Sequence, residues 1–195
     1  MIYLVDFDIT VTKQDTLETI MREYNPEAIS IIKQKYRNGE ISMYDYIESA
    51  LLSLNITKEQ YIKCLVDNVD IDETFIDFFN SHNVKIVSFG TKLNIVSVLK
   101  KYGINISKED VYANDIEIKD KKVNIINKLE NKKDIVKEMQ KYDEVTFIGD
   151  GPSDYDAMKV ADFVFARSET RAVKYLRENK IDFKEFNNFN EIGKD

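Results

Sequence analysis

The chain has 195 residues, of which 43% are hydrophobic and 32% are charged, and its net charge is −7 at pH 7. This composition is typical of a soluble globular protein with one full hydrophobic core, and it excludes a disordered or membrane-embedded chain. The acidic balance argues against a nucleic-acid backbone or an anionic membrane as the main partner.

The single cysteine, Cys64, excludes an internal disulfide and fits a reducing compartment, so we expect a cytoplasmic protein. One cysteine and one histidine, His82, cannot build a zinc site. The apolar run at the N-terminus is about five residues long, too short for a signal peptide or a membrane span. We therefore expect neither a membrane nor nucleic acid as a partner.

In chain order, the first predicted strand covers residues 2–5 and runs directly into the acidic stretch DFDIT. Residues 12–82 follow with helical periodicity and no strand-like run. Ser42 and Thr57 are candidate N-caps in this segment, and only Thr57, with Gln60 three residues later, has a good capping-box pattern. We predict that residues 12–82 form a helical cap domain inserted after the first strand.

Four further apolar segments, rich in Val, Ile and Phe, are predicted strands. They cover residues 84–88, 110–114, 144–149 and 162–166. Near-continuous apolar runs separated by helical patterns favour a Rossmann-like, doubly wound parallel sheet of the α/β class. The alternating stretch 116–126 predicts a small β-hairpin beside the sheet. The predicted core domain therefore comprises residues 1–11 and 83–195.

Carboxylates follow two predicted strands at the edge where a doubly wound sheet binds ligands. Asp6 and Asp8 follow the first strand, and Asp150 and Asp154 lie in GDGPSDYD after residues 144–149. Two carboxylates about 4 Å apart repel by roughly 4 kcal/mol at an effective dielectric of about 20. Four together require a cation, and oxygen ligands without His or Cys favour Mg²⁺. The alternative is that these aspartates only cap helices and form turns.

The motifs DFDIT and GDGPSDYD, a strand ending in Ser88 and a lysine upstream of the last motif resemble the four motifs of the haloacid dehalogenase superfamily of phosphohydrolases. The cap position resembles the phosphoserine-phosphatase-like branch of this superfamily. The segments IMREYNP, NGEIS and 165–189 resemble its methionine-salvage phosphatases. The resemblance covers essentially the whole chain and implies the fold and the phosphatase activity of this superfamily.

The resemblance also implies a catalytic role for three side chains. Asp6 would be the nucleophile that forms an aspartyl phosphate, and Asp8 would be the general acid and base. Lys132, with Lys133 as the alternative, would offset negative charge on the transferring phosphoryl group.

Metal and phosphate ligands are implied in the same way. The expected cofactor is Mg²⁺, held by Asp6, Asp8 through its backbone carbonyl, Asp150 and the neighbouring Asp154. The implied substrate- and phosphate-binding residues are Thr10, Asp15, Ser88, Phe89, Gly90 and Ser153.

Some positions depart from the pattern of the superfamily. Ile9 stands where relatives usually have Gly or Ser, and Phe89 where they usually have Gly, so both bear on the substrate class. The arginine that holds the amino acid in phosphoserine phosphatases aligns with Glu48. A carboxylate cannot bind another carboxylate directly, which argues against phosphoserine unless Arg22 or Arg37 replaces that arginine.

We therefore predict a Mg²⁺-dependent phosphomonoester hydrolase that acts on a small phosphorylated metabolite, as a monomer or a homodimer. One alternative is a phosphotransferase or phosphomutase that uses the same aspartyl phosphate with a sugar or alcohol acceptor. A more distant alternative is a receiver-like phospho-acceptor domain in signalling. Receiver domains share an acidic cluster, but they lack the inserted helical segment and the second aspartate two residues after the first.

Overall fold

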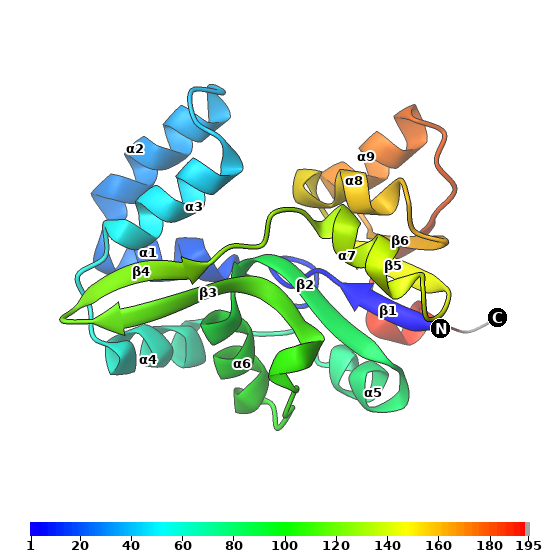
Figure 1. Ribbon diagram of the computed structural model, residues 1–195, viewed down its shortest axis with the longest axis horizontal. Coiled ribbons are helices and arrows are strands. Elements are labelled where there is room, and N and C mark those ends of the chain that lie inside the picture. Colours follow the sequence, from blue (N-terminus) through cyan, green and yellow to red (C-terminus); the bar gives the residue numbers. More distant parts are fainter. Residues whose placement is uncertain (194–195) are drawn as a thin grey trace.

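The computed structural model describes residues 1–193, and within that range seven strands form one sheet (Figure 1). The strand order is β4-β3-β2-β1-β5-β6-β7, and neighbours are parallel except for the antiparallel pair β3 and β4. The strands are β1 (Ile2–Val5), β2 (Val84–Thr91), β3 (Val111–Lys119), β4 (Lys122–Asn127), β5 (Val145–Gly149), β6 (Phe163–Arg167) and β7 (Lys184–Phe186). The predicted doubly wound α/β fold is confirmed.

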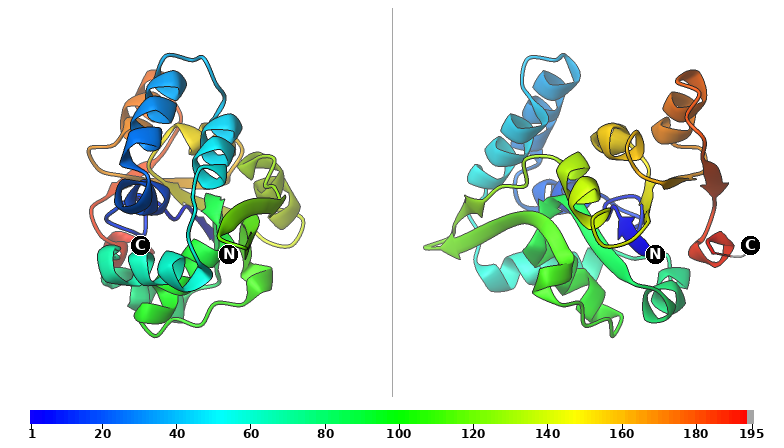
Figure 2. Two further views of the ribbon diagram at one scale, coloured as in Figure 1. Left: turned by 90° about the vertical axis from the view of Figure 1, so that its left-hand side faces the viewer. Right: turned by 45° about the vertical axis from the view of Figure 1, so that its right-hand side comes forward.

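Helices cover both faces of the sheet (Figures 1 and 2). In Figure 1, α4, α5 and α6 lie below the sheet, and α7, α8 and α9 lie above it. Their bounds are α4 (Lys58–Asn68), α5 (Thr74–Ser81), α6 (Lys92–Lys101), α7 (Lys132–Met139), α8 (Tyr155–Met158) and α9 (Arg171–Glu178); the short 3-10 helices are η1 (Lys108–Asp110), η2 (Pro152–Asp154) and η3 (Phe189–Glu191). Across residues 1–193, no helix combines the length and apolar character that crossing a membrane requires.

The helices inserted between β1 and β2 lie in two places. The first three are α1 (Thr16–Tyr24), α2 (Pro26–Arg37) and α3 (Met43–Leu52). They pack against one another, α3 also contacts β4, and in Figure 1 α2 and α3 project away from the sheet. Helix α4 packs against both α1 and α6, and α5 packs against η3. The inserted segment therefore supplies both a projecting helical group and part of the layer below the sheet.

Two of the inserted helices begin with a capping box. At the start of α4, the Thr57 hydroxyl accepts from the Gln60 amide, and the Gln60 side chain accepts from the Thr57 amide. The expectation that only Thr57 has a good capping box is wrong, because Ser42 and Asp45 form the same pair of bonds at α3. The shorter Asp45 carboxylate still reaches the Ser42 amide at 3.0 Å.

Strand β3 takes part in two kinds of pairing. Its residues 111–114 pair in parallel with β2, and residues 115–119 pair antiparallel with β4. The sequence-based prediction treated residues 110–114 and the hairpin 116–126 as separate elements, whereas one continuous strand serves both. The register of β2 against β3 shifts between Ser88 and Thr91, at the carboxyl end of β2.

Candidate active site

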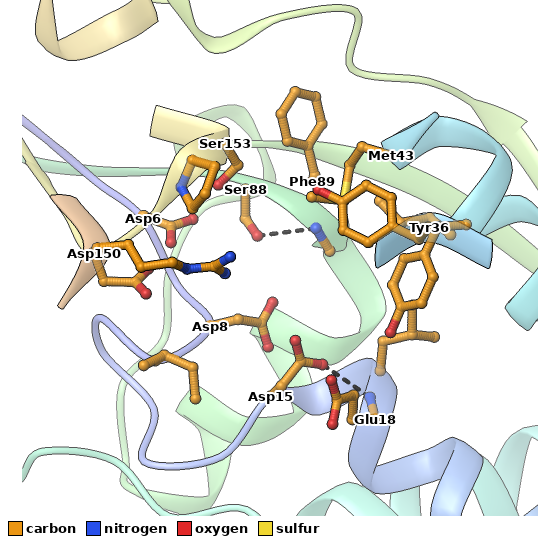
Figure 3. Close-up of a pocket in the computed structure, with 18 of the residues that line it drawn as sticks. Asp6, Asp8, Asp15, Glu18, Tyr36, Met43, Ser88, Phe89, Asp150 and Ser153 are labelled. Carbon is orange, nitrogen blue, oxygen red and sulfur yellow. Dashed lines mark hydrogen bonds between the residues drawn. The ribbon is translucent and has the colours of Figure 1, made fainter. Parts of the chain in front are cut away.

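The carboxyl ends of the central strands border a cavity of about 330 Å³ (Figure 3). Asp6 and Asp8 reach this cavity from the segment after β1, Ser88 from β2 and Asp150 from the segment after β5. Residues of α1, α2 and α3 form another part of the wall. Side chains that are far apart in the sequence therefore border one space at the edge of the sheet.

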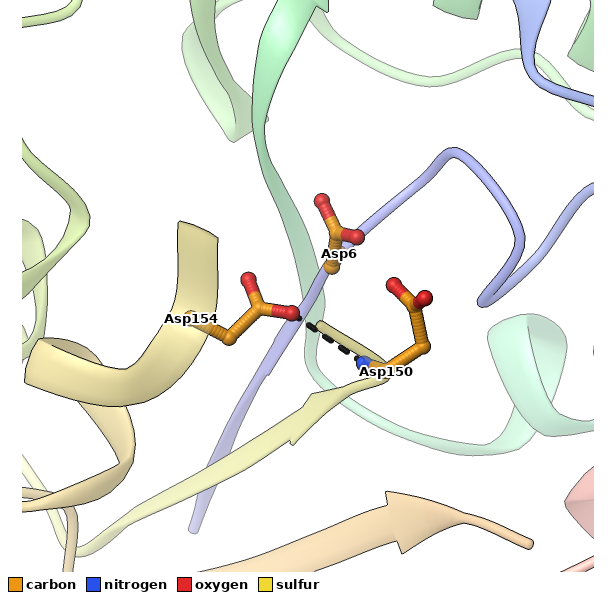
Figure 4. Close-up of side chains that lie close together, drawn as sticks. All are labelled: Asp6, Asp150 and Asp154. Atoms are coloured by element: carbon orange, nitrogen blue, oxygen red, sulfur yellow. Dashed lines mark hydrogen bonds between the residues drawn. The ribbon is translucent and has the colours of Figure 1, made fainter. Parts of the chain in front are cut away.

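Three carboxylates form a cluster at this edge (Figure 4). One oxygen from each of Asp6, Asp150 and Asp154 lies within 4.8 Å of the other two. The Asp6 amide donates to the Ile148 carbonyl of β5 at 2.9 Å, which extends the β1–β5 ladder by one residue. This bond holds Asp6 beside the end of β5, from which Asp150 projects.

Asp154 is fully buried, and both of its oxygens are bound. Its Oδ2 accepts from the backbone amides of Asp150 and Gly151, each at 3.1 Å, and its Oδ1 accepts from the Lys132 ammonium at 2.7 Å. A Cβ at Gly149 would lie 2.5 Å from Asp154 Oδ2, so glycine is required for this close approach. Asp154 therefore fixes the loop that carries Asp150.

Lys132 is the buried cation of the cluster. It begins α7, whose N-cap is Asn131, and its Nζ donates to Asp6 Oδ1 at 2.5 Å and to Asp154 Oδ1 at 2.7 Å. Burial alone would lower the pKa of Lys132, but the Asp154 and Asp6 carboxylates outweigh that effect and raise the pKa above its ordinary value. The ammonium is therefore charged and directed at the carboxylate of Asp6.

One lysine does not balance the carboxylates around it. Burial raises the pKa of Asp6 to about 6, with a further contribution from the Asp154 charge. Burial likewise raises the pKa of Asp150 to about 8, with the Asp6 and Asp154 charges adding to the effect. A divalent cation would favour the ionised forms, and a set of carboxylate oxygens suits Mg²⁺. The residues present therefore fit the expected metal, which Asp6 and Asp150 would hold through their carboxylate oxygens.

Asp8 lies in a separate environment from this cluster. Its Oδ1 accepts from the Thr16 amide at 2.7 Å. Burial raises the pKa of Asp8 to about 7, and the nearby Asp15 charge contributes to the rise. The Asp8 side chain is thus set apart from the three-carboxylate group, and its carboxyl can hold a proton near neutral pH.

Ser88, Phe89 and Gly90 form the wall contributed by β2. The Ser88 hydroxyl accepts from the Gly90 amide at 2.9 Å (Figure 3). A Cβ at Gly90 would lie 2.9 Å from Asp8 Oδ2, so this glycine allows the strand to pass close to the carboxylate. The Phe89 ring lies 5.5 Å from Lys132 Nζ and 5.5 Å from the ring of Tyr44 on α3. Phe89 therefore lies between the lysine and the projecting helices.

Thr10 joins two of the carboxylates. It is fully buried, and its hydroxyl lies 3.4 Å from Asp6 Oδ2 and 3.3 Å from Asp150 Oδ1. Ile9 beside it has a φ of 64°, which is a left-handed conformation that β-branched residues rarely adopt. The strained position explains in physical terms why glycine suits this place in the loop, and Ile9 lines the cavity there.

The wall from α1, α2 and α3 contains both charged and apolar side chains. Asp15 caps α1 by accepting from the Glu18 amide at 2.8 Å (Figure 3), and Glu18 pairs with Lys33 of α2. The apolar and aromatic lining residues from these helices are Leu17, Tyr36, Met43, Tyr46 and Ile47. Glu48 lies elsewhere, paired with Lys128 at 2.9 Å. Of the two arginines considered as replacements, Arg37 lines the cavity, whereas Arg22 pairs with Glu18 and is not among the described lining residues.

The chain is similar to curated proteins along nearly its whole length. It is 27% identical over 214 residues to Pdp3-interacting factor 1 of Schizosaccharomyces pombe, covering 97% of this chain and 92% of that protein. It is 26% identical over 206 residues to the 2-hydroxy-3-keto-5-methylthiopentenyl-1-phosphate phosphatase of Bacillus mycoides, covering 96% and 91%. No protein-family model matches the chain.

Solved structures share the arrangement of strands and helices. A substrate-bound phosphoserine phosphatase superposes with a TM-score of 0.75 at 22% identity, covering 98% of this chain and 95% of that one. A HAD family hydrolase from Salmonella enterica serovar Typhi superposes with a TM-score of 0.76 at 18% identity, covering 95% of this chain and 66% of that one. The chain has the fold of the haloacid dehalogenase phosphatases. The resemblance to these enzymes, and to the methionine-salvage phosphatases among them, is confirmed.

In this haloacid dehalogenase fold, most of the site residues implied by the resemblance lie around one cavity. Those that line it are Asp6, Asp8, Asp15, Ser88, Phe89, Gly90, Lys132, Asp150 and Ser153. Thr10 and Asp154 are buried directly behind the wall, where they contact Asp6 and Lys132 respectively. Lys133, the alternative lysine, is half-buried and is not among the described residues that line the cavity.

Sequence reasoning missed several charged residues at or near this cavity. Lys33 and Arg171 line the cavity, and Arg167 donates to the backbone of Thr10. Arg167 directly follows the predicted strand 162–166, so the rule that picked out the aspartates at strand ends would have found it. Lys33 and Arg171 lie on helices among other exposed charges, and nothing in their spacing distinguishes them.

Proposed function

We propose that the protein is a Mg²⁺-dependent phosphomonoester hydrolase that works through an aspartyl phosphate on Asp6. The observation that carries this proposal is the contact of the buried Lys132 ammonium with the Asp6 carboxylate. An oxygen of Asp6 lies within 4.8 Å of oxygens of two further carboxylates, those of Asp150 and Asp154. An ordinary turn or helix cap does not require a buried carboxylate cluster with a lysine inside it.

In the first step, Asp6 would attack phosphorus, forming a bond between its carboxylate oxygen and phosphorus while the bond to the leaving oxygen breaks. Asp8 would give a proton to that leaving oxygen and would then take one from the water that hydrolyses the aspartyl phosphate. Lys132 and the Ser88 hydroxyl, both on the cavity wall, would hold the oxygens of the phosphoryl group.

The side chains of Asp6 and Asp150, with the Asp8 backbone carbonyl, would hold Mg²⁺, and Asp154 would keep their loop in place. When bound, the metal supplies positive charge that offsets the carboxylates and the phosphate. Thr10 contributes by fixing the relative positions of the Asp6 and Asp150 carboxylates.

We infer that residues 12–82 act as the cap, with α1, α2 and α3 as the part that covers the phosphate site. Support comes from the cavity wall, to which these three helices contribute alongside the core loops. A cap that closes would exclude bulk water during phosphoryl transfer. A cytoplasmic location belongs to the same proposal, as the single cysteine suggests.

The substrate would be a small phosphorylated metabolite. The cavity of about 330 Å³ limits the size of the leaving group, and its mixed wall suits a group with both polar and apolar parts. The Bacillus mycoides relative is named for 2-hydroxy-3-keto-5-methylthiopentenyl-1-phosphate, which makes that compound one candidate.

A metabolite panel tests the proposed function. Phosphate release is measured from this phosphate ester, phosphoserine, sugar phosphates, pyridoxal phosphate and a generic aryl phosphate, each with Mg²⁺ and with EDTA. We expect release that requires Mg²⁺ and is fastest for one small ester. No release from any ester, or release of equal rate in EDTA, would refute the proposal. Adding acceptor alcohols and analysing the products distinguishes hydrolysis from phosphotransfer.

A further inference from the structure

Arg167, the last residue of β6, connects three segments beside the phosphate site. Its Nε and Nη2 both donate to the Thr10 carbonyl, at 3.0 and 2.7 Å. Its Nη2 also donates to Asp72 Oδ2 at 2.9 Å, and its Nη1 donates to the Asn187 carbonyl at 2.9 Å. One guanidinium group thus binds the loop after β1, the segment that precedes α5 and the segment after β7.

Through Thr10, Arg167 is connected to the carboxylates of the site. Thr10 is fully buried, so its carbonyl would lack a partner without the two bonds from Arg167. Its hydroxyl lies between the carboxylates of Asp6 and Asp150, at 3.4 and 3.3 Å. A movement of the Thr10 backbone would therefore shift the hydroxyl that bonds to both of these carboxylates.

Through Asp72, Arg167 is connected to the two segments that join the inserted helices to the sheet. The Asp72 amide donates to the Val11 carbonyl at 2.9 Å, and Thr12 forms an isolated antiparallel bridge with Ile71. Residues 11–12 lead from the sheet into the inserted helices, and residues 71–72 form the returning connection before α5. The two connections are therefore paired with each other at this point. Asp72 Oδ1 accepts from the Thr74 amide at 3.1 Å, which leaves Oδ2 for Arg167.

The surroundings of Arg167 suit a guanidinium group. Its side chain is only 20% exposed, and its central carbon lies 5.0 Å from the Phe186 ring centroid and 5.8 Å from that of Phe189. A planar fork can donate twice to one carbonyl while it lies over aromatic rings. A lysine ammonium has no such fork.

We propose that Arg167 is a positioning residue for phosphoryl transfer, which holds the Thr10 loop in the geometry that Asp6 requires and ties that loop to the returning connection at Asp72. This inference rests on the proposed function. Arg167 is not among the described residues that line the cavity, so it acts through Thr10 and not by touching the substrate.

The test compares Arg167→Gln with Arg177→Gln. Arg177 is an exposed arginine that pairs with Glu185 on the surface, so it controls for the loss of one arginine. At a temperature well below both melting points, we expect Arg167→Gln to lower kcat by at least about tenfold. Its KM for the best substrate is expected to stay within about threefold of the wild-type value, because no cavity contact is lost.

Hydrogen exchange followed by mass spectrometry supplies a readout that does not depend on activity. Peptides that contain the amides of Val11, Thr12 and Asp72 are expected to exchange faster in Arg167→Gln than in Arg177→Gln. If Arg167→Gln fails to fold, Arg167→Lys replaces it, because lysine cannot donate twice to the Thr10 carbonyl, and the same changes are expected.

The outcomes separate this inference from the proposed function. An unchanged kcat, or exchange in these peptides that matches the control, would overturn the positioning role. A fall in kcat explained by less folded protein would also overturn it. If the wild-type protein hydrolyses no phosphate ester, the proposed function fails, and the exchange data alone then decide whether Arg167 fixes the loop.

Discussion

Lys132 and Asp154 show how single residues maintain the charge balance of the site. Lys132 contacts two buried carboxylates, and Asp154 holds both that lysine and the backbone amides of the Asp150 loop. Each depends on the other, because a buried charge without a partner is strongly unfavourable. Lys132 lines the cavity and Asp154 is buried behind it, which indicates that stability and activity are linked here.

Replacing Lys132 by Met is expected to leave the carboxylates of Asp6 and Asp154 without their cation. The free energy of unfolding should fall by about 3–5 kcal/mol in EDTA, measured by urea denaturation. Lys133→Met is the matched control, since Lys133 is half-buried and, within residues 1–193, forms no ion pair with the three carboxylates. We expect the control to change stability by no more than about 0.5 kcal/mol. Equal losses in the two variants would speak against the structural role of Lys132.

Replacing two glycines of the motif GDGPSDYD by alanine is expected to change the stability of the protein by different amounts. In Gly149→Ala the new Cβ would meet Asp154 Oδ2 at 2.5 Å, so the carboxylate must move and stability should fall by about 1–3 kcal/mol. A Cβ at Gly151 would meet nothing within 4 Å, so Gly151→Ala should melt within a few degrees of the wild type. Thermal melts of both variants check this difference, and a Gly149→Ala protein as stable as Gly151→Ala would contradict it.

At the residue scale, the sequence predicted those side chains that directly follow buried strands. Asp6, Asp150 and Ser88 lie where a parallel sheet presents its carboxyl ends, so a local pattern was sufficient to find them. The left-handed backbone of Ile9 and the bonds of Arg167 to Thr10 could not be predicted, because they depend on contacts across the fold. Lys132 was singled out from Lys133 by the resemblance, and its burial agrees with that choice.

At the scale of elements, periodicity located most strands and helices but not their ends. The run at residues 84–88 continues to Thr91 in β2, and the strand at 110–114 continues into the hairpin as β3. Strand β7, only three residues long and mostly exposed, has no apolar run by which it could have been recognised. Its place in the sheet is set by pairing with β6, which sequence patterns do not report.

The capping box of α3 offers a test at this scale. In Ser42→Ala the Asp45 amide loses its acceptor, so stability should fall by about 1 kcal/mol. Ser30→Ala is the control, because Ser30 lies inside α2 and alanine favours a helix interior. We expect Ser30→Ala to be neutral or slightly stabilising in chemical denaturation. If Ser42→Ala is no less stable than Ser30→Ala, the capping box contributes nothing measurable.

At the scale of the whole molecule, the edge of the sheet that borders the cavity has three carboxylates close together with one lysine among them. Such an arrangement is unfavourable without a compensating cation, and a bound divalent ion would stabilise the folded protein. The raised pKa of Asp150, caused by burial and by the Asp6 and Asp154 charges, reflects the same imbalance. Stability should therefore depend on metal through this cluster.

Thermal melts of Asp150→Asn test this dependence. In EDTA the variant should be at least as stable as the wild type, because one repelled carboxylate is removed. Mg²⁺ at about 100 times its Kd should raise the melting temperature of the wild type by about 5–10 °C and that of the variant much less. Asp156→Asn, at a carboxylate whose side chain is 75% exposed, should respond like the wild type. A wild-type shift that persists in Asp150→Asn would place the metal elsewhere.

The most direct measurement is the rate at which Asp6→Asn hydrolyses the best phosphate ester with Mg²⁺, set beside the wild type and Asp156→Asn. Asparagine keeps the shape of Asp6 but removes its nucleophilic carboxylate. We predict a loss in kcat of at least about 10³-fold for Asp6→Asn and wild-type turnover for Asp156→Asn. Wild-type turnover by correctly folded Asp6→Asn would contradict the assignment of Asp6 as the nucleophile and, with it, the proposed mechanism.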